Sequence, residues 1–263
     1  MPSFDEWFAA LARGAGATYE QVWSAAFGAS QHIGQQGYLT ADAIVALGRA
    51  VGAGPGTRVL DVCCGPGAPV ALLARRLGCS AVGVDRSGAA LRFAAGRAGA
   101  PRYVMGDAMS LPFATAAFDS VVMFHSMLAI PDKTALLREV ARVLVSGGRF
   151  GCTAEVGTPL DGAELAKMEP DPLAHVLEES DLLGMLRGAG LLPRRVDDLT
   201  RQHAGIARRL ADAMTAARGP LARDLGTTAV DAVLASTLIW ADLFERRRVA
   251  AIAIVAQRQP SPA

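Results

Sequence analysis

The sequence contains little lysine, few cysteines and no long apolar run. Lys133 and Lys167 are its only lysines, so its basic residues are nearly all arginine. The 26 basic and 25 acidic residues leave a formal net charge of +1, which does not indicate a nucleic-acid-binding surface. The longest apolar run, Val249–Ala256, is much shorter than the roughly 20 residues of a membrane-spanning helix. We therefore predict a soluble protein with no nucleic-acid or membrane partner.

Cysteine chemistry is equally limited. The four cysteines are Cys63, Cys64, Cys79 and Cys152. They form no C-x-x-C pair, and no histidine lies at the spacing of zinc ligands. The N-terminal residues MPSFDEW are acidic and lack the apolar segment of a signal peptide. These features predict free thiols, no metal site and a cytoplasmic location.

The rest of the composition is that of a globular protein. With 263 residues, of which 51% are hydrophobic and 19% charged, the chain is long enough for one large α/β domain with a substantial core. It contains no internal repeat and no low-complexity segment. We expect a single domain.

The segment Val59–Ala68 is the most informative part of the chain. It is typical of a short apolar strand that ends in an acidic, glycine-bearing turn, and residues 70–77 then follow a helical apolar pattern. Such a turn presents free backbone N–H groups to a ligand, and Gly65 and Gly67 allow close approach of the backbone. Asp61, at the end of the strand, favours the cationic amino group of an amino acid over a pyrophosphate, which it would repel.

A second acidic residue follows the next predicted strand. Residues 80–84 form that strand, and Asp85 comes directly after it, 20 residues beyond Gly65. A carboxylate at this place can accept hydrogen bonds from both hydroxyls of a ribose. The pattern therefore predicts a nucleoside ligand without identifying it.

Two motifs together resemble a known family. Val59–Ala68 is similar to the first motif of class I S-adenosylmethionine (SAM)-dependent methyltransferases, with Cys63 where the family usually has its first glycine. Gly106–Phe113 is similar to the Gly-Asp-Ala-x-x-Leu-Pro-Phe segment of the small-molecule members. The resemblance covers about residues 55–200. It implies an α/β, Rossmann-like fold whose twisted seven-stranded sheet has the order 3-2-1-4-5-7-6, with strand 7 antiparallel and helices on both faces.

The resemblance also implies a cofactor and its binding residues. The cofactor would be S-adenosyl-L-methionine, with S-adenosyl-L-homocysteine as product. Asp107 would accept a hydrogen bond from the adenine amino group, and Ala108 and Met109 would border the ring. The predicted cofactor-binding residues are Asp61, Cys63, Gly65, Gly67, Asp85, Arg86, Asp107, Ala108, Met109, Phe124 and Gln36.

Catalytic candidates lie where strands end or where the pocket would be covered. A base is needed only if the acceptor atom starts protonated, and an imidazole suits that role at neutral pH. His125 follows the fourth predicted strand, which begins at Phe118, and is the first candidate. Glu155, at the end of the fifth strand, is the second, and His175 is the third, while His203 is another histidine of the covering regions.

We divide the single domain into three parts. Residues 1–54 would be an N-terminal helical lid, 55–199 the cofactor-binding core, and 200–245 a helical insertion before the last strand. The stripe Tyr19, Trp23 and Phe27 fits either plain core packing or the lid. A turn at 146–148 would precede the fifth strand at 149–154, and residues 155–172 would form a loop.

The function indicated is methyl transfer from SAM to an oxygen, nitrogen or carbon atom of a small organic molecule, by analogy a secondary metabolite. No Asn-Pro-Pro-Tyr or Asp-Pro-Pro-Tyr segment follows the fourth strand, which argues against methylation of nucleic-acid amino groups. One alternative is a protein that binds SAM or its product but catalyses another reaction, such as a cyclisation. An NAD-dependent oxidoreductase is a weaker one, because Val70 replaces the third glycine of G-x-G-x-x-G. A non-enzymatic interaction protein is weaker still, and a homodimer remains open.

Overall fold

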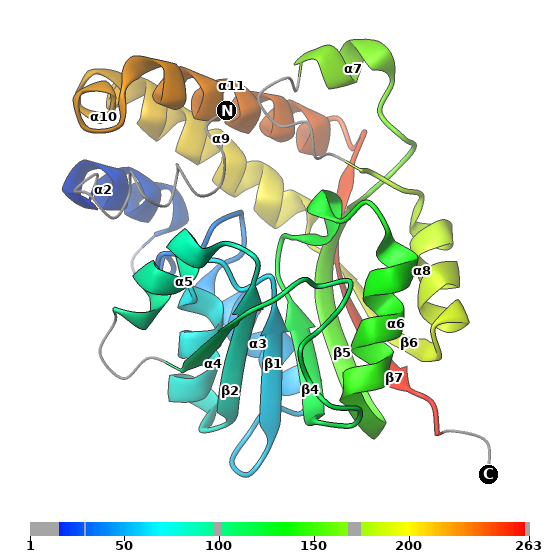
Figure 1. Cartoon of the computed structure of the whole chain (residues 1–263). Coiled ribbons are helices and arrows are strands. Elements are labelled where there is room, and N and C mark those ends of the chain that lie inside the picture. Colours follow the sequence, from blue (N-terminus) through cyan, green and yellow to red (C-terminus); the bar gives the residue numbers. More distant parts are fainter. Residues whose placement is uncertain (1–15, 29, 97–100, 168–174, 261–263) are drawn as a thin grey trace.

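The computed structural model describes residues 16–28, 30–96, 101–167 and 175–260 (Figure 1). Its centre is a seven-stranded sheet with the order β3-β2-β1-β4-β5-β7-β6. Strands β1 to β5 run parallel, and β7 is antiparallel to both β5 and β6. This confirms the predicted sheet. The strands are β1 (Arg58–Val62), β2 (Ser80–Asp85), β3 (Arg102–Met105), β4 (Phe118–Met123), β5 (Leu144–Val156), β6 (Leu191–Asp198) and β7 (Ala250–Arg258).

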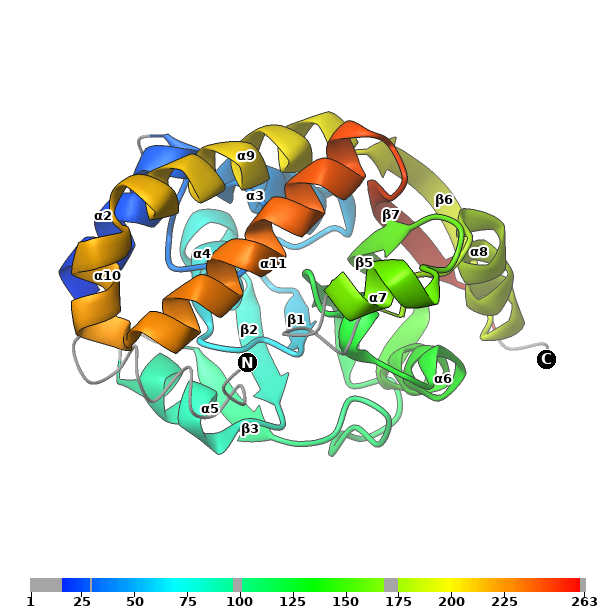
Figure 2. The ribbon, with the colours of Figure 1, turned by 90° about the horizontal axis from the view of Figure 1, so that it is seen from above.

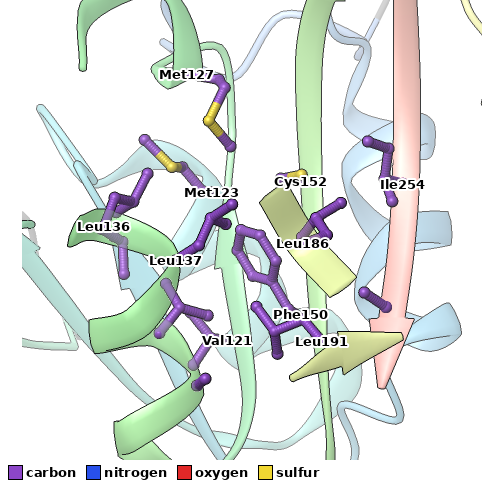
Figure 3. Packing of buried hydrophobic residues seen from close by; sticks show 14 of the residues in the cluster. Val121, Met123, Met127, Leu136, Leu137, Phe150, Cys152, Leu186, Leu191 and Ile254 are labelled. Atoms are coloured by element: carbon purple, nitrogen blue, oxygen red, sulfur yellow. The ribbon is translucent and has the colours of Figure 1, made fainter. Parts of the chain in front are cut away.

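Helices cover both faces of the sheet. One face carries α3 (Ala41–Ala50), α4 (Ala68–Leu77) and α5 (Gly88–Ala95), and the other carries α6 (Lys133–Val143) and α8 (Glu179–Gly188). Figure 3 shows side chains of α6 and α8 packed against Phe150 of β5 and Val121 of β4. Strands buried on both faces are apolar along most of their length, which explains the continuous apolar runs in β4 and β7.

A helical cap lies over the edge of the sheet where the parallel strands end (Figures 1 and 2). It consists of α2 (Gly16–Phe27), α9 (Thr200–Ala216), α10 (Arg218–Leu225) and α11 (Thr227–Glu245), so residues 200–245 are helical, as predicted. Tyr19, Trp23 and Phe27 are buried together with Ile206 and Leu210 of α9. The aromatic stripe therefore holds α2 inside the cap.

Three predicted details were wrong. The N-terminal lid does not extend to residue 54, because Ile44 and Leu47 of α3 pack on the sheet face with Leu73. Strand β5 starts at Leu144, which pairs with Phe118, since Gly147 at φ +76° distorts the strand without ending it. The segment predicted as a loop contains the short helix α7 (Gly162–Lys167).

Helix α11 is long and apolar enough, by length and composition alone, to cross a membrane. Core helices of other proteins meet the same criterion. Within its most apolar stretch of 18 residues, 33% is buried in this structure, and the helix packs along α9.

Candidate functional site

A cavity of about 260 Å³ opens at the carboxyl ends of β1, β2 and β4, beneath the cap. Gln36 and His125 also line it. The other predicted cofactor residues on its wall are Asp61, Cys63, Gly65, Asp85, Arg86, Asp107, Ala108, Met109 and Phe124. Three sequence segments far apart in the chain are thus brought to one cavity, as expected for strand ends at the edge of an open parallel sheet.

Asp61 is the most deeply buried carboxylate of the cavity. Its residue is 1% exposed, and Oδ2 has no hydrogen-bond partner within the described part of the chain. Burial raises the pKa of Asp61 well above its ordinary value, and the nearby Asp85 raises it further, against a lowering by the backbone N–H of Val70. An unpaired buried carboxylate is costly, so this position favours a cationic partner.

The turn after β1 is held by the second carboxylate. Asp85 accepts hydrogen bonds from the backbone N–H groups of Gly65 and Ser87, both at 2.8 Å. Each of its oxygens keeps another lone pair for a ligand hydroxyl. Cys63 adopts φ +58°, a left-handed conformation that fits the glycine usual at this place. Burial, followed by the charges of Asp85 and Asp61, raises the pKa of the Cys63 thiol to about 12, so the thiol stays protonated.

Gly67 does not line the cavity. It begins α4 at φ +75°, and a Cβ there would lie 2.3 Å from Oη of Tyr103, whose hydroxyl donates to the Gly67 carbonyl at 3.3 Å. The glycine is therefore needed for the turn and for the packing of β3 against it.

We expect Gly67→Ala to lower the free energy of unfolding by about 1–2 kcal/mol, because alanine is strained at positive φ. The matched control is Gly184→Ala inside α8, where a Cβ meets nothing within 4 Å. That change should raise stability by about 0.5–1 kcal/mol. Urea denaturation of both variants checks this, and a Gly67→Ala protein as stable as the wild type would contradict it.

The third carboxylate lies on a loop that α6 holds in place. Asp107 is exposed, and its Oδ1 accepts from the N–H of Met109 at 2.9 Å. Glu139 accepts from the N–H of Leu111 at 2.7 Å, and Arg142 donates to the carbonyls of Leu111 and Phe113. Arg142 also holds the pKa of Glu139 below its ordinary value through their hydrogen bonds. The sequence analysis assigned no role to Glu139 or Arg142.

Arg142→Ala should lower the free energy of unfolding by about 1–2 kcal/mol, because two backbone carbonyls and Glu139 lose a charged donor at a partly exposed site. Since the folded-state pKa of Glu139 is lowered, the pair stabilises the fold above about pH 4.5 and less so as the pH falls below it. Denaturation at pH 7 and pH 3.5 measures both effects. A difference between variant and wild type that is equally large at the two pH values would contradict the role of Glu139.

His125 and Glu155 form a buried pair at the end of β4 and β5. Nδ1 of His125 lies 3.0 Å from Oε1 of Glu155, and the side chains are 10% and 4% exposed. Nε2 of His125 accepts the backbone N–H of Tyr38 at 3.1 Å. Because Nε2 is an acceptor, the proton of the neutral ring sits on Nδ1 and is donated to Glu155. A Cβ on Gly37 would lie 2.6 Å from this ring, so Gly37 permits the contact.

His203 of α9 stacks on the other side of His125, with ring centroids 4.7 Å apart. His125, Glu155 and His203 offer ligand atoms within 4.8 Å of one another, a spacing that a metal ion accepts. A metal-bound imidazole, however, donates its other N–H to an acceptor. In His125 that other nitrogen accepts an N–H instead, so we assign no metal to this cluster.

Other candidates are placed differently. His175 is exposed and is not part of the cavity wall; its N–H donates to the carbonyl of Leu128. Ten lining residues were not predicted. Four of them follow His125 on the same cavity wall, namely Ser126, Ala129, Ile130 and Pro131, and the other six are Cys64, Pro66, Pro69, Val84, Ser87 and Gly106. His125 was predicted because it follows the end of β4. The same argument, applied to the next few residues, would have identified the four that follow it.

The residues present fit SAM. The unpaired Oδ2 of Asp61 suits its amino group, Asp85 keeps acceptor capacity for the ribose, and the Asp107 loop offers a further acceptor. SAM carries its positive charges on the amino group and the sulfonium, which matches a cavity whose charged wall residues are three carboxylates and Arg86 among the described positions.

Comparisons with known proteins agree. A model of the methyltransferase domain family matches residues 60–152. The chain is 33% identical to Methyltransferase GfsG of Streptomyces halstedii over 202 residues, 72% of this chain and 70% of that protein. It is 41% identical to a 2-phytyl-1,4-naphtoquinone methyltransferase of Synechococcus elongatus over 103 residues, but this spans only 36% of the chain and 44% of the relative.

Among solved structures, the [4+2]-cyclase SpnF has a similar fold, with a TM-score of 0.75 at 20% identity over 99% of this chain and 98% of that one. Such a likeness shows the fold alone. The match to GfsG covers most of both sequences. The match to the family model spans the cavity residues from Asp61 to Pro131. The chain therefore belongs to the class I SAM-dependent methyltransferases, and its cofactor is S-adenosyl-L-methionine.

Proposed function

We propose that this methyltransferase acts on an uncharged, hydroxyl-bearing small molecule of secondary metabolism and that the acceptor atom lies beside His125. The observation that carries the proposal is the buried His125–Glu155 pair on the wall of the cofactor cavity, 3.0 Å apart. The name of one relative, a naphtoquinone methyltransferase, supports a small organic acceptor. Within the described residues Arg86 is the single cationic side chain on the cavity wall, which disfavours a phosphorylated acceptor.

The chemistry divides between cofactor and protein. Bound SAM supplies a methyl group on a positively charged sulfur, which is already electrophilic. The chain has to hold the acceptor in line, exclude water and remove a proton from the hydroxyl. We assign the proton to Nε2 of His125, and Glu155 beside Nδ1 would stabilise the resulting imidazolium.

Proton transfer to Nε2 requires its hydrogen bond with Tyr38 to open. Gly34 and Gly37, at φ +87° and +101°, lie in the segment that leads into Tyr38, and Gly37 directly precedes this N–H. The backbone there has conformational freedom that other residues lack. We propose that the acceptor hydroxyl replaces the Tyr38 N–H at Nε2.

A second candidate is a reaction that needs no base, such as a cyclisation, with SAM or its product as a bound structural ligand. The hydrogen bond that occupies Nε2 of His125 favours it, because the ring then has no free lone pair for a substrate proton. The fold shared with the [4+2]-cyclase SpnF is compatible with this alternative.

Methyl-labelled SAM, incubated with a panel of phenols, hydroquinones and aliphatic alcohols and their phosphate esters, tests the proposal. We expect label to move into uncharged hydroxyl compounds. Consumption of a compound without gain of label would favour the second candidate. Preferential labelling of the phosphate esters would contradict the assigned acceptor class. Calorimetric titration should show binding of SAM and none of NAD.

A further inference from the structure

His203 is buried at the base of the cap, next to the His125–Glu155 pair. It is 0% exposed and lies in the first turn of α9. That turn is tied to the sheet, because the N–H of Leu199 donates to the carbonyl of Ala251 at 2.8 Å and the N–H of Ala251 donates to Oγ1 of Thr200 at 3.1 Å. The position of the His203 ring is thus fixed relative to β7 and β5.

The surroundings of the ring are aromatic. His203 stacks on His125 with an interplanar angle of 28°, and the rings of Tyr38 and Phe244 lie 5.9 and 5.7 Å away. A phenylalanine would satisfy all of these contacts. Packing alone therefore does not explain a histidine, whose two nitrogens cost free energy when they are buried without partners.

Both ring nitrogens of His203 have no hydrogen-bond partner among the described residues, and the same holds for Oε2 of Glu155. One of these nitrogens lies within 4.8 Å of a carboxylate oxygen of Glu155. Burial, followed by the neighbouring His125, lowers the pKa of His203 well below its ordinary value, so the ring is neutral and carries one N–H. The groups that face it are Glu155 from β5, His125 after β4 and the Tyr38 ring.

We propose that His203 is a positioning residue for Glu155. The polar atoms of the two side chains lie within 4.8 Å and lack partners among the described residues, so a small shift of these side chains lets the His203 N–H donate to the carboxylate, which is then held between two imidazoles. With both oxygens then paired, Glu155 accepts the Nδ1–H of His125 and keeps the proton of that ring on Nδ1. This leaves the lone pair of Nε2 on the side of Tyr38. Neither the family motifs nor the sequence comparisons assign His203 a role of this kind.

Nitrogen-15 spectra of the histidine rings test the assignment without an acceptor substrate, and the chain has only four histidines to assign. In the wild type at pH 7 we expect His125 protonated on Nδ1 and His203 in one neutral tautomer. In His203→Phe the carboxylate loses its donor, so His125 should change its tautomer or exchange between both. His203→Gln, which retains an N–H donor, should restore the wild-type His125 signals.

The matched control is His32→Phe, since His32 lies against Trp23 and Phe27 in the cap, away from the pair. It should leave the His125 signals unchanged. If His203→Phe does so as well, His203 only fills space and the proposal fails. Should that variant not fold, the wild-type spectrum still decides, because a His203 ring that exchanges between tautomers or carries two protons at pH 7 overturns the proposal.

A second readout rests on the proposed base role of His125. The methyl-transfer rate constant should fall several-fold in His203→Phe, because His125 no longer keeps its proton on Nδ1 and its lone pair on Nε2. It should return in His203→Gln. An unchanged rate constant together with a changed His125 tautomer would contradict the base role of His125 and leave His203 as a positioning residue. An unchanged tautomer would reject His203 itself.

Discussion

Asp61→Asn should weaken SAM binding by about 100-fold while leaving the protein folded. Removal of one partner of a buried charge pair typically costs 2–5 kcal/mol. Asp61 is 1% exposed, and its Oδ2 has no protein partner within the described residues, so the amino group of the cofactor is the cation that this carboxylate would pair with. Isothermal titration with SAM measures the loss.

The same variant should be more stable than the wild type when no cofactor is bound. Because burial raises the folded-state pKa of Asp61, the folded wild type holds this proton more tightly, and its stability falls as the pH rises above about 4. Asparagine does not titrate. The difference in melting temperature between the variant and the wild type should therefore favour the variant more at pH 7 than at pH 4. A parallel loss of stability and of SAM affinity would instead indicate a structural role.

Two controls sharpen this prediction. Asp119→Asn alters a carboxylate that pairs with Arg58, half-exposed and far from the cavity, and should leave SAM affinity unchanged. The wild type should bind an analogue of S-adenosyl-L-homocysteine that lacks the amino group more weakly than it binds S-adenosyl-L-homocysteine. Asp61→Asn and the wild type should bind this analogue with equal affinity. Equal penalties in both proteins would show that Asp61 does not contact the amino group.

His125→Ala should lower the methyl-transfer rate constant by about 100-fold or more, which is the usual contribution of a positioned base. SAM affinity should change by no more than a few-fold, because the contacts of His125 are with Glu155, Tyr38 and His203 and not with Asp61 or Asp85. Initial rates with an acceptor that the wild type methylates, together with SAM titration, separate the two quantities.

Glu155→Gln is the companion variant, since it keeps the shape of the pair but removes the charge that would stabilise the imidazolium. We expect a comparable fall in rate. Full turnover in His125→Ala would exclude a base at this position and would favour an acceptor that carries no proton or the cyclisation alternative.

The cofactor cavity was largely predictable from the sequence because its parts are local. Asp61 and Asp85 lie at the carboxyl ends of short strands, and Asp107 follows a third strand by two residues. The carboxyl ends of parallel strands meet at one edge of the sheet. Gln36 was predicted only from the family resemblance, and the structure puts it on the cavity wall. Cys63 showed that the turn tolerates a non-glycine residue at positive φ.

What could not be predicted depends on partners distant in the sequence. The N–H of Tyr38 donates to His125, which lies 87 residues further along the sequence. No local pattern predicts that both nitrogens of this imidazole are already hydrogen-bonded. The need for Gly67 comes from Tyr103, 36 residues away, rather than from a ligand. The backbone N–H of His175 donates to the carbonyl of Leu128, but His175 is exposed and does not line the cavity. No local sequence pattern indicated which way its side chain would point.

A crystal structure of the complex with S-adenosyl-L-homocysteine tests the central claim most directly. We predict one molecule in the cavity, with its amino group at Asp61, its ribose hydroxyls at Asp85, its adenine beside Asp107, and its sulfur facing His125. A molecule that lies elsewhere, or that leaves Asp61 and Asp85 without contact, would contradict the account.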